Sequence, residues 1–132
     1  MKYERIKYED LNDKQKEKYN YQKISAVLAD YGFITIPLSD DWNGADFLAV
    51  HKDGDTLKIQ LKGRMSFAKK YLSKDLHICF RDADTWYLYP HDDLLEMVNI
   101  KTSLDWEQKG LYTFPSLSKA NREILKKWII SS

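Results

Sequence analysis

Residues that cross-link or break a chain are scarce here: the sequence has one cysteine, three prolines and five glycines among 132 residues. Because Cys79 is alone, no disulfide can form within the chain, and we expect a buried thiol and a reducing, cytoplasmic setting. Long hydrophobic runs are also missing, since none approaches the ~20 residues of a membrane-spanning helix. The N-terminal residues lack the apolar segment of a signal peptide.

An excess of charge of one sign is missing too. Lys and Arg number 21 against 20 Asp and Glu, which gives a net charge of +1. A protein that coats DNA without regard to sequence is usually far more basic. Any contact with nucleic acid must therefore come from a local basic patch. Apolar residues make up 43% and charged residues 31%, a globular composition whose length suits a single domain over residues 1–132.

The hydrophobic pattern predicts an α/β fold. A helix begins near Asp10, is capped by Asn12 or Asp13, and ends before Gly32. Strands are predicted over residues 33–38, 45–51, 56–62, 76–81, 85–89 and 111–114; residues 39–44 are a predicted loop, 63–74 a basic loop with a short helix, 92–98 a helix, and the last helix runs from Ser116 or Ser118 to about Ile130. This alternation indicates a mixed central sheet flanked by helices. The aromatic residues 106–132 either pack on the sheet or mediate a homodimer.

Polar side chains meet apolar ones on the predicted hairpin of residues 45–62. Side chains alternate between the two faces of a strand, so Gln60 and Lys62 share one face. A two-residue turn would pair Asp46 with Leu61 and put a carboxylate among core leucines, which is costly. A three-residue loop, which suits Gly54 at positive φ, pairs Asp46 with Gln60 or Lys62. We therefore predict the three-residue loop.

These residues suit a divalent ion and a phosphate. Mg²⁺ prefers hard oxygen ligands, which the Asp46 carboxylate, the Gln60 amide and the backbone carbonyl of Leu61 can supply. A metal at this place would polarise a phosphoryl group and lower the pKa of a bound water. Lys62 would orient that water and stabilise charge on phosphorus.

Asp46 followed by Gln60-Leu61-Lys62 resembles the motif of the PD-(D/E)XK nuclease superfamily, in the variant with Gln that Mrr-like restriction endonucleases carry. The preceding helix is similar to the first helix of archaeal Holliday-junction resolvases, and the similarity covers about residues 19–90. The resemblance implies a restriction-endonuclease-like αβββαβ core, to which the remaining residues add a C-terminal helical extension. It also implies Mg²⁺ or Mn²⁺ as cofactor.

One position departs from that family. Its members often carry a Glu on the first helix, about one turn before the position of Ile24. Tyr21 and Gln22 stand there in this chain, and Glu17 lies a further turn away. With Gln60 in place of the second acid, the sequence leaves one certain carboxylate at the site, so we expect weaker Mg²⁺ binding.

The resemblance implies a metal-dependent DNA endonuclease of restriction, homing or resolvase-like use. Its DNA-backbone contacts would come from Lys58, Arg64, Lys69 and Lys70. As a homodimer, it could cut two strands with two sites. The alternative is a catalytically weak or inactive module of the same fold that binds nucleic acid or protein, and a third reading is an unrelated α/β interaction domain.

Overall fold

The computed structural model describes residues 1–42 and 44–132, without the side chains of Asp41 and Trp42. Within this part of the chain, one sheet has six strands in the order β1-β2-β3-β5-β6-β8 and a second sheet pairs β4 with β7. The strands are β1 (Phe33–Trp42), β2 (Ala45–His51), β3 (Thr56–Leu61), β4 (Ser66–Ala68), β5 (Leu76–Asp82), β6 (Thr85–Pro90), β7 (Leu111–Thr113) and β8 (Ile129–Ser131). The α-helices are α1 (Asp13–Ala29), α2 (His91–Leu95), α3 (Leu104–Lys109) and α4 (Lys119–Leu125), and the 3-10 turns are η1 (Tyr8–Asp10), η2 (Lys69–Tyr71) and η3 (Lys126–Trp128). Because β3 and β5 are parallel and the other pairs antiparallel, the predicted α/β class with a mixed sheet is confirmed.

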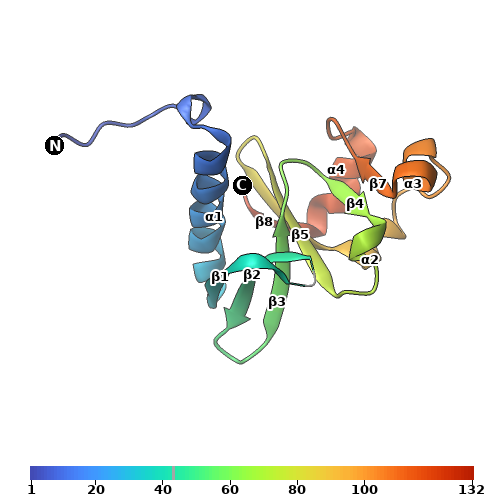
Figure 1. Ribbon diagram of the computed structural model, residues 1–132, viewed down its shortest axis with the longest axis horizontal. Coiled ribbons are helices and arrows are strands. Elements are labelled where there is room, and N and C mark those ends of the chain that lie inside the picture. Colours follow the sequence, from blue (N-terminus) through green and yellow to red (C-terminus); the bar gives the residue numbers. More distant parts are fainter. Residues whose placement is uncertain (43) are drawn as a thin grey trace.

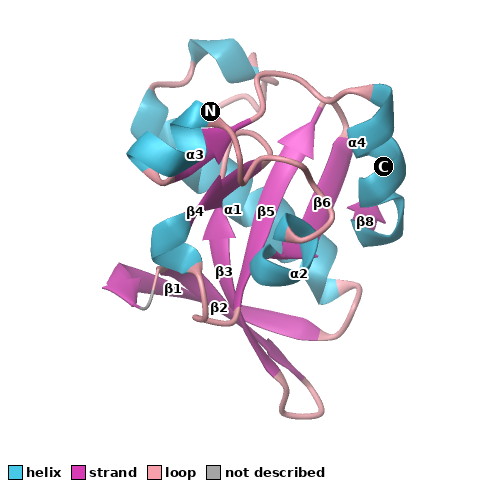
Figure 2. Cartoon of the chain, turned by 90° about the vertical axis from the view of Figure 1, so that its right-hand side faces the viewer, coloured by secondary structure: helices cyan, strands magenta, loops and turns pink. Residues whose placement is uncertain are grey.

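The large sheet carries a hydrophobic core on each face. On one face, Ile24 and Leu28 of α1 are buried against Phe47, Ile59 and other strand residues. The β4–β7 pair and helices α2, α3 and α4 cover the other face (Figure 1; Figure 2 shows the sheet after a quarter turn). None of the described helices is both long and apolar enough to cross a membrane.

Helix α1 begins with a capping box. The Asn12 side chain accepts a hydrogen bond from the Gln15 backbone amide at 2.8 Å, and the Gln15 side chain accepts one from the Asn12 amide at 2.9 Å. These two bonds satisfy amides that the first turn leaves without partners. The prediction of Asn12 as a cap is confirmed, although the helix begins at Asp13 and not near Asp10, where η1 stands apart.

Strand β1 is longer than its sequence predicts. Residues 39–42, predicted as loop, continue the strand. Pro37 lies inside the strand and pairs with Phe47. An edge strand tolerates proline because one side of its backbone has no ladder to join, and β1 is the edge of the sheet. The ladder is irregular between Pro37 and Trp42, which frees this end of β1 to bend.

The hairpin loop has the predicted odd length. Val50 pairs with Thr56, and the amide of His51 donates to the carbonyl of Asp55, so residues 52–54 form a three-residue loop. Gly54 has φ +102°, a backbone conformation that glycine adopts without strain. The register set by this loop decides which side chains of β2 and β3 face each other.

Two helical predictions hold only in part. Residues 63–74 contain a short helix, the three-residue 3-10 helix η2, but they also contain the strand β4, which the sequence pattern does not predict. Since Met65, Phe67, Ala68 and Tyr71 are buried, apolar contacts hold this crossover against the sheet. The last helix stops at Leu125, and the chain ends in β8, which pairs with β6, so the C-terminal residues complete the sheet instead of forming a purely helical extension.

Candidate functional site

The register of the hairpin places Asp46 opposite Gln60. The last ladder pair joins Phe47 to Ile59, and one further step along both strands reaches these two polar residues. Just beyond the ladder, the backbone amide of Leu61 donates to Oδ2 of Asp46 at 2.9 Å. The carboxylate takes the place of a strand carbonyl, which fixes its position at the end of the sheet. The proposed role of the Leu61 carbonyl as a metal ligand stays a prediction.

Gly44 lets the chain enter β2 close to the opposite core. Its φ is +85°, and a Cβ at this position would lie 2.8 Å from Cδ1 of Leu76 and 3.2 Å from Cδ1 of Tyr71. Contacts under 3.0 Å require a neighbour to move, and L-residues adopt this φ only at a cost. Glycine is therefore the residue that fits two positions before Asp46.

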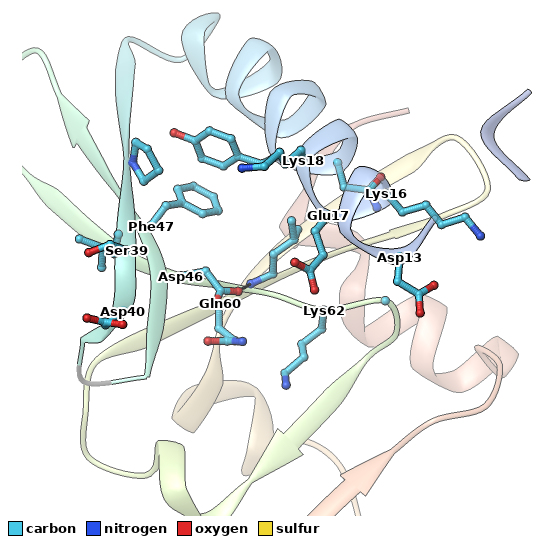
Figure 3. A pocket seen from close by; sticks show the side chains of 16 residues that line it. Asp13, Lys16, Glu17, Lys18, Ser39, Asp40, Asp46, Phe47, Gln60 and Lys62 are labelled. Atoms are coloured by element: carbon cyan, nitrogen blue, oxygen red, sulfur yellow. Dashed lines mark hydrogen bonds between the residues drawn. The ribbon is translucent and has the colours of Figure 1, made fainter. Parts of the chain in front are cut away.

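A cleft of about 780 Å³ opens at this end of the sheet. Its lining comes from the first turns of α1, from residues 37–40 of β1, from Asp46 and Phe47 of β2, and from residues 60–63. The three predicted site residues Asp46, Gln60 and Lys62 all line it. In Figure 3 their polar groups point toward the same space. The structure thus brings together the carboxylate, the amide and the ammonium group.

Gln60 is the most buried polar group of the cleft, with 8% of its surface exposed. Its Oε1 atom is buried and has no hydrogen-bond partner among the described residues. Leaving a buried polar atom unpaired costs about 1–3 kcal/mol. An oxygen held at this cost beside a carboxylate is a group that a ligand of the cleft can satisfy.

Lys62 is the cationic member of the group. Its Nζ lies 5.5 Å from the ring centroid of Tyr71, and the Nζ of Lys70 lies 5.3 Å from the same ring. Among the described residues, no carboxylate lies within 4.0 Å of Lys62 Nζ. The aromatic ring holds the ammonium without neutralising it, so its charge stays available to an anion.

Helix α1 also lines the cleft with carboxylates, those of Asp13 and Glu17. Glu17 lines it, and in Figure 3 its carboxylate points toward the space between Asp46 and Lys62. The sequence does contain a signal for this: Asp13, Glu17 and Tyr21 follow at intervals of four and continue the buried stripe of Ile24 and Leu28 past the end of the sheet. The helix therefore adds the Glu17 carboxylate to the group of Asp46, Gln60 and Lys62.

The basic residues predicted to contact DNA do not line this cleft. Arg64 is exposed and follows Gly63, the last residue of the cleft lining. Lys70 contacts the ring of Tyr71, which Lys62 also contacts. Lys69 points elsewhere, with its Nζ 5.7 Å from the ring centroid of Trp106. Lys58 lies on β3, two residues before Gln60, where it is half-buried and pairs with Leu48 of β2.

The ligand set of the cleft is made of oxygens. Among the side chains that the structure describes, which exclude those of residues 41–43, no group of three or more His, Cys, Asp or Glu residues could hold a metal ion. The cleft also has the amide oxygen of Gln60 beside the carboxylates of Asp46 and Glu17. Glutamine is not one of the four residue types that define such a group. Asp40 also lines the cleft, whereas the side chain of Asp41 lies outside the described residues. Hard oxygens of this kind suit Mg²⁺ or Mn²⁺.

Cys79 and the histidines take no part in the cleft. Cys79 is buried as predicted, and burial raises the pKa of its thiol, so it stays protonated. His91 is buried as well, and desolvation lowers its pKa, although its hydrogen bond to Asp92 acts in the opposite direction. Its Nε2 accepts a bond from the Ala68 amide at 3.0 Å and its Nδ1 lies 2.8 Å from Asp92. The bond from the Ala68 amide ties the end of β4 to α2.

A comparison with models of known protein families finds none that matches the chain, and a comparison with curated proteins finds no similar sequence.

Proposed function

We propose that this protein is a metal-dependent DNA endonuclease that hydrolyses a phosphodiester in the cleft of Asp46, Gln60 and Lys62. One observation carries the proposal: β2, β3 and the residue after β3 bring a carboxylate, a buried amide oxygen and an ammonium group to one cleft, and among the described residues that oxygen has no hydrogen-bond partner and that ammonium no ion-pair partner. Packing alone gives no reason to bury Gln60 with Oε1 unpaired among the described residues. A divalent cation that takes oxygen atoms as ligands would give a reason.

The residues present fit a divalent cation. Asp46 and Gln60 would hold it from the strands, with Glu17 adding negative charge from α1. Bound Mg²⁺ or Mn²⁺ would polarise the phosphoryl group and make a water more acidic. The resemblance to PD-(D/E)XK nucleases, in the spacing of Asp46 and Gln60-Leu61-Lys62, supports the same assignment.

The protein's own residues prepare the other parts of the reaction. The hydrogen bond from the Leu61 amide fixes the orientation of the Asp46 carboxylate. Lys62, held over Tyr71, stabilises the negative charge that grows on the phosphoryl oxygens and orients the attacking water. Arg64 and Lys70 follow in sequence and hold the DNA backbone at the rim, which is where a nearly neutral protein needs its local positive charge.

The test is cleavage of supercoiled plasmid, branched DNA and single strands with Mg²⁺ or Mn²⁺. Asp46→Asn keeps an oxygen that accepts from Leu61, and Lys62→Met keeps the stem that packs on Tyr71, so both variants should fold. We expect each to lower the cleavage rate by on the order of 100-fold or more, the loss seen when one positioned charge or donor is removed. Circular dichroism and urea unfolding check that the fold is kept.

Asp55→Asn is the matched control because it changes an exposed aspartate at the far end of the same hairpin. It should cleave like the parent. Cleavage that persists in both Asp46→Asn and Lys62→Met would remove this site assignment. DNA binding without cleavage under every metal would instead favour the non-cutting module of the same fold.

A further inference from the structure

A second cavity, of about 280 Å³, adjoins the cleft. Asn20 and residues 61–63 line both spaces, so the two meet along the side of Lys62. The remaining walls of the second cavity include Tyr8 of η1, Arg81 of β5 and Trp86 of β6. A space of this size is just below the range of pockets that hold drug-sized ligands, so it suits one nucleotide and not a base pair.

The two spaces differ in charge. The cleft is lined by four acids, Asp13, Glu17, Asp40 and Asp46, together with three lysines. The described lining of the second cavity holds two cations, Lys62 and Arg81, and no acid. The first is therefore suited to a cation and the second to an anion, with Lys62 at the boundary.

Arg81 is held in place by aromatic rings. Its guanidinium carbon lies 5.3 Å from the ring centroid of Tyr8 and 5.5 Å from that of Trp86. Among the described residues, no carboxylate lies within ion-pair distance of it. Rings contact a guanidinium through its plane and leave its N–H edges able to bind a phosphate with two hydrogen bonds. A charge positioned in this way loses little freedom on binding.

Asn20 adds a group that needs a donor. Its Nδ2 donates to the hydroxyl of Tyr8 at 2.9 Å, whereas its Oδ1 is buried without a hydrogen-bond partner in the described structure. A phosphate has only acceptors at neutral pH, so it cannot satisfy this oxygen. Every DNA base carries an N–H donor on its pairing edge, and that edge is reached most easily when the base is unpaired.

From these contacts we propose that the second cavity binds one unpaired nucleotide of the substrate strand. Arg81 and Lys62 bind its phosphate, and Oδ1 of Asn20 accepts from its base. The proposal rests on the proposed nuclease function and adds the class of substrate, namely DNA with an unpaired nucleotide next to the bond that is cut.

Binding measured without metal tests the cavity separately from cleavage. Fluorescence anisotropy with EDTA present compares a single-stranded oligonucleotide, the same strand fully paired, and the strand with abasic sites. We expect the intact single strand to bind most tightly. Arg81→Met should weaken its binding about 5- to 150-fold. The slope of the logarithm of affinity against the logarithm of salt concentration should become smaller by about one. Asn20→Leu, which is of similar size and removes the accepting oxygen, should weaken the binding as well.

Lys127→Met is the matched control, since Lys127 also places its Nζ over a tryptophan ring, 4.6 Å from that of Trp128, away from both cavities. It should bind like the parent. Equal affinity of Arg81→Met and Lys127→Met would overturn the proposal, as would equal binding of paired, abasic and intact strands. Competition by a free deoxynucleoside monophosphate as strong as that by the oligonucleotide would assign the cavity to free nucleotides and overturn its link to a strand.

The two proposals can fail separately. If Arg81-dependent binding is found but no metal supports cleavage, the nucleotide cavity stands and the nuclease function falls. If the parent cleaves DNA while Arg81→Met binds and cleaves like the parent, the cavity proposal falls and the nuclease function stands.

Discussion

The cleft has two walls that are built differently. The strand wall, with Asp46, Gln60 and Lys62, is fixed by the β2–β3 ladder, by the bond from Leu61 and by the ring of Tyr71. The helix wall carries Glu17 in the first turns of α1, where the side chain is exposed. Chemistry that depends on position therefore belongs to the strand wall, and the helix wall contributes mainly charge.

The largest effect should come from the strand wall. Gln60→Leu puts an apolar side chain of similar size in place of a buried amide whose Oε1 has no hydrogen-bond partner in the described part of the chain. We expect the free energy of unfolding to rise by about 1 kcal/mol, because an orphaned polar atom is removed, while the cleavage rate falls by on the order of 100-fold. Urea unfolding and plasmid cleavage measure the two quantities. A variant that is more stable and equally active would mean that Gln60 has no part in the site.

Gly44→Ala tests how closely the strand wall is fitted to its surroundings. The new Cβ would meet Leu76 at 2.8 Å and adopt φ +85°, so we expect unfolding to become easier by about 1–3 kcal/mol. Gly54→Ala has a positive φ but open space, and Gly63→Ala has neither problem. The loss in the free energy of unfolding, measured in urea, should be largest at Gly44, smaller at Gly54 and smallest at Gly63. An equal loss at Gly44 and Gly54 would show that the close approach to Leu76 costs nothing.

The strand wall is the part of the site that the sequence predicts. Burying a carboxylate among leucines is costly, and Gly54 allows the three-residue loop that avoids it, so local physics selects the register of Asp46 and Gln60. The spacing of Glu17 puts it on the buried side of α1, but the sequence does not predict that it reaches the cleft, because which turn of a helix passes the end of a sheet depends on how the helix crosses it. The same limit applies to β8. Three residues are too few to show an alternating hydrophobic pattern, and they form a strand because they pair with the edge of β6.

The helix wall should show a smaller effect. Glu17→Gln removes one charge at an exposed position, so we expect the Mg²⁺ concentration needed for half-maximal cleavage to rise on the order of tenfold. Stability should stay within about 0.5 kcal/mol of the parent. Glu107→Gln, at an exposed place on α3, is the control. A loss of maximal rate as deep as that of Gln60→Leu would erase the distinction between the walls.

The smallest expected effect concerns the support behind the strand wall, and it depends on pH. His91 accepts from the Ala68 amide, so protonating it would break that bond and bury a charge, and burial accordingly lowers its pKa. A group whose folded pKa lies below its unfolded value stabilises the fold above the unfolded pKa of about 6.5 and loses that contribution as the pH falls. Between pH 7.5 and 6.0, His91 should account for a loss of up to about 0.8 kcal/mol.

His91→Gln tests this, because glutamine keeps an acceptor for Ala68 and does not titrate. His77, whose pKa burial also lowers, adds a loss of the same sign in both proteins. The measurement is therefore the difference between the two urea-unfolding series, with the variant losing less stability than the parent on acidification. Identical losses would mean that the bond between His91 and Ala68 does not respond to pH.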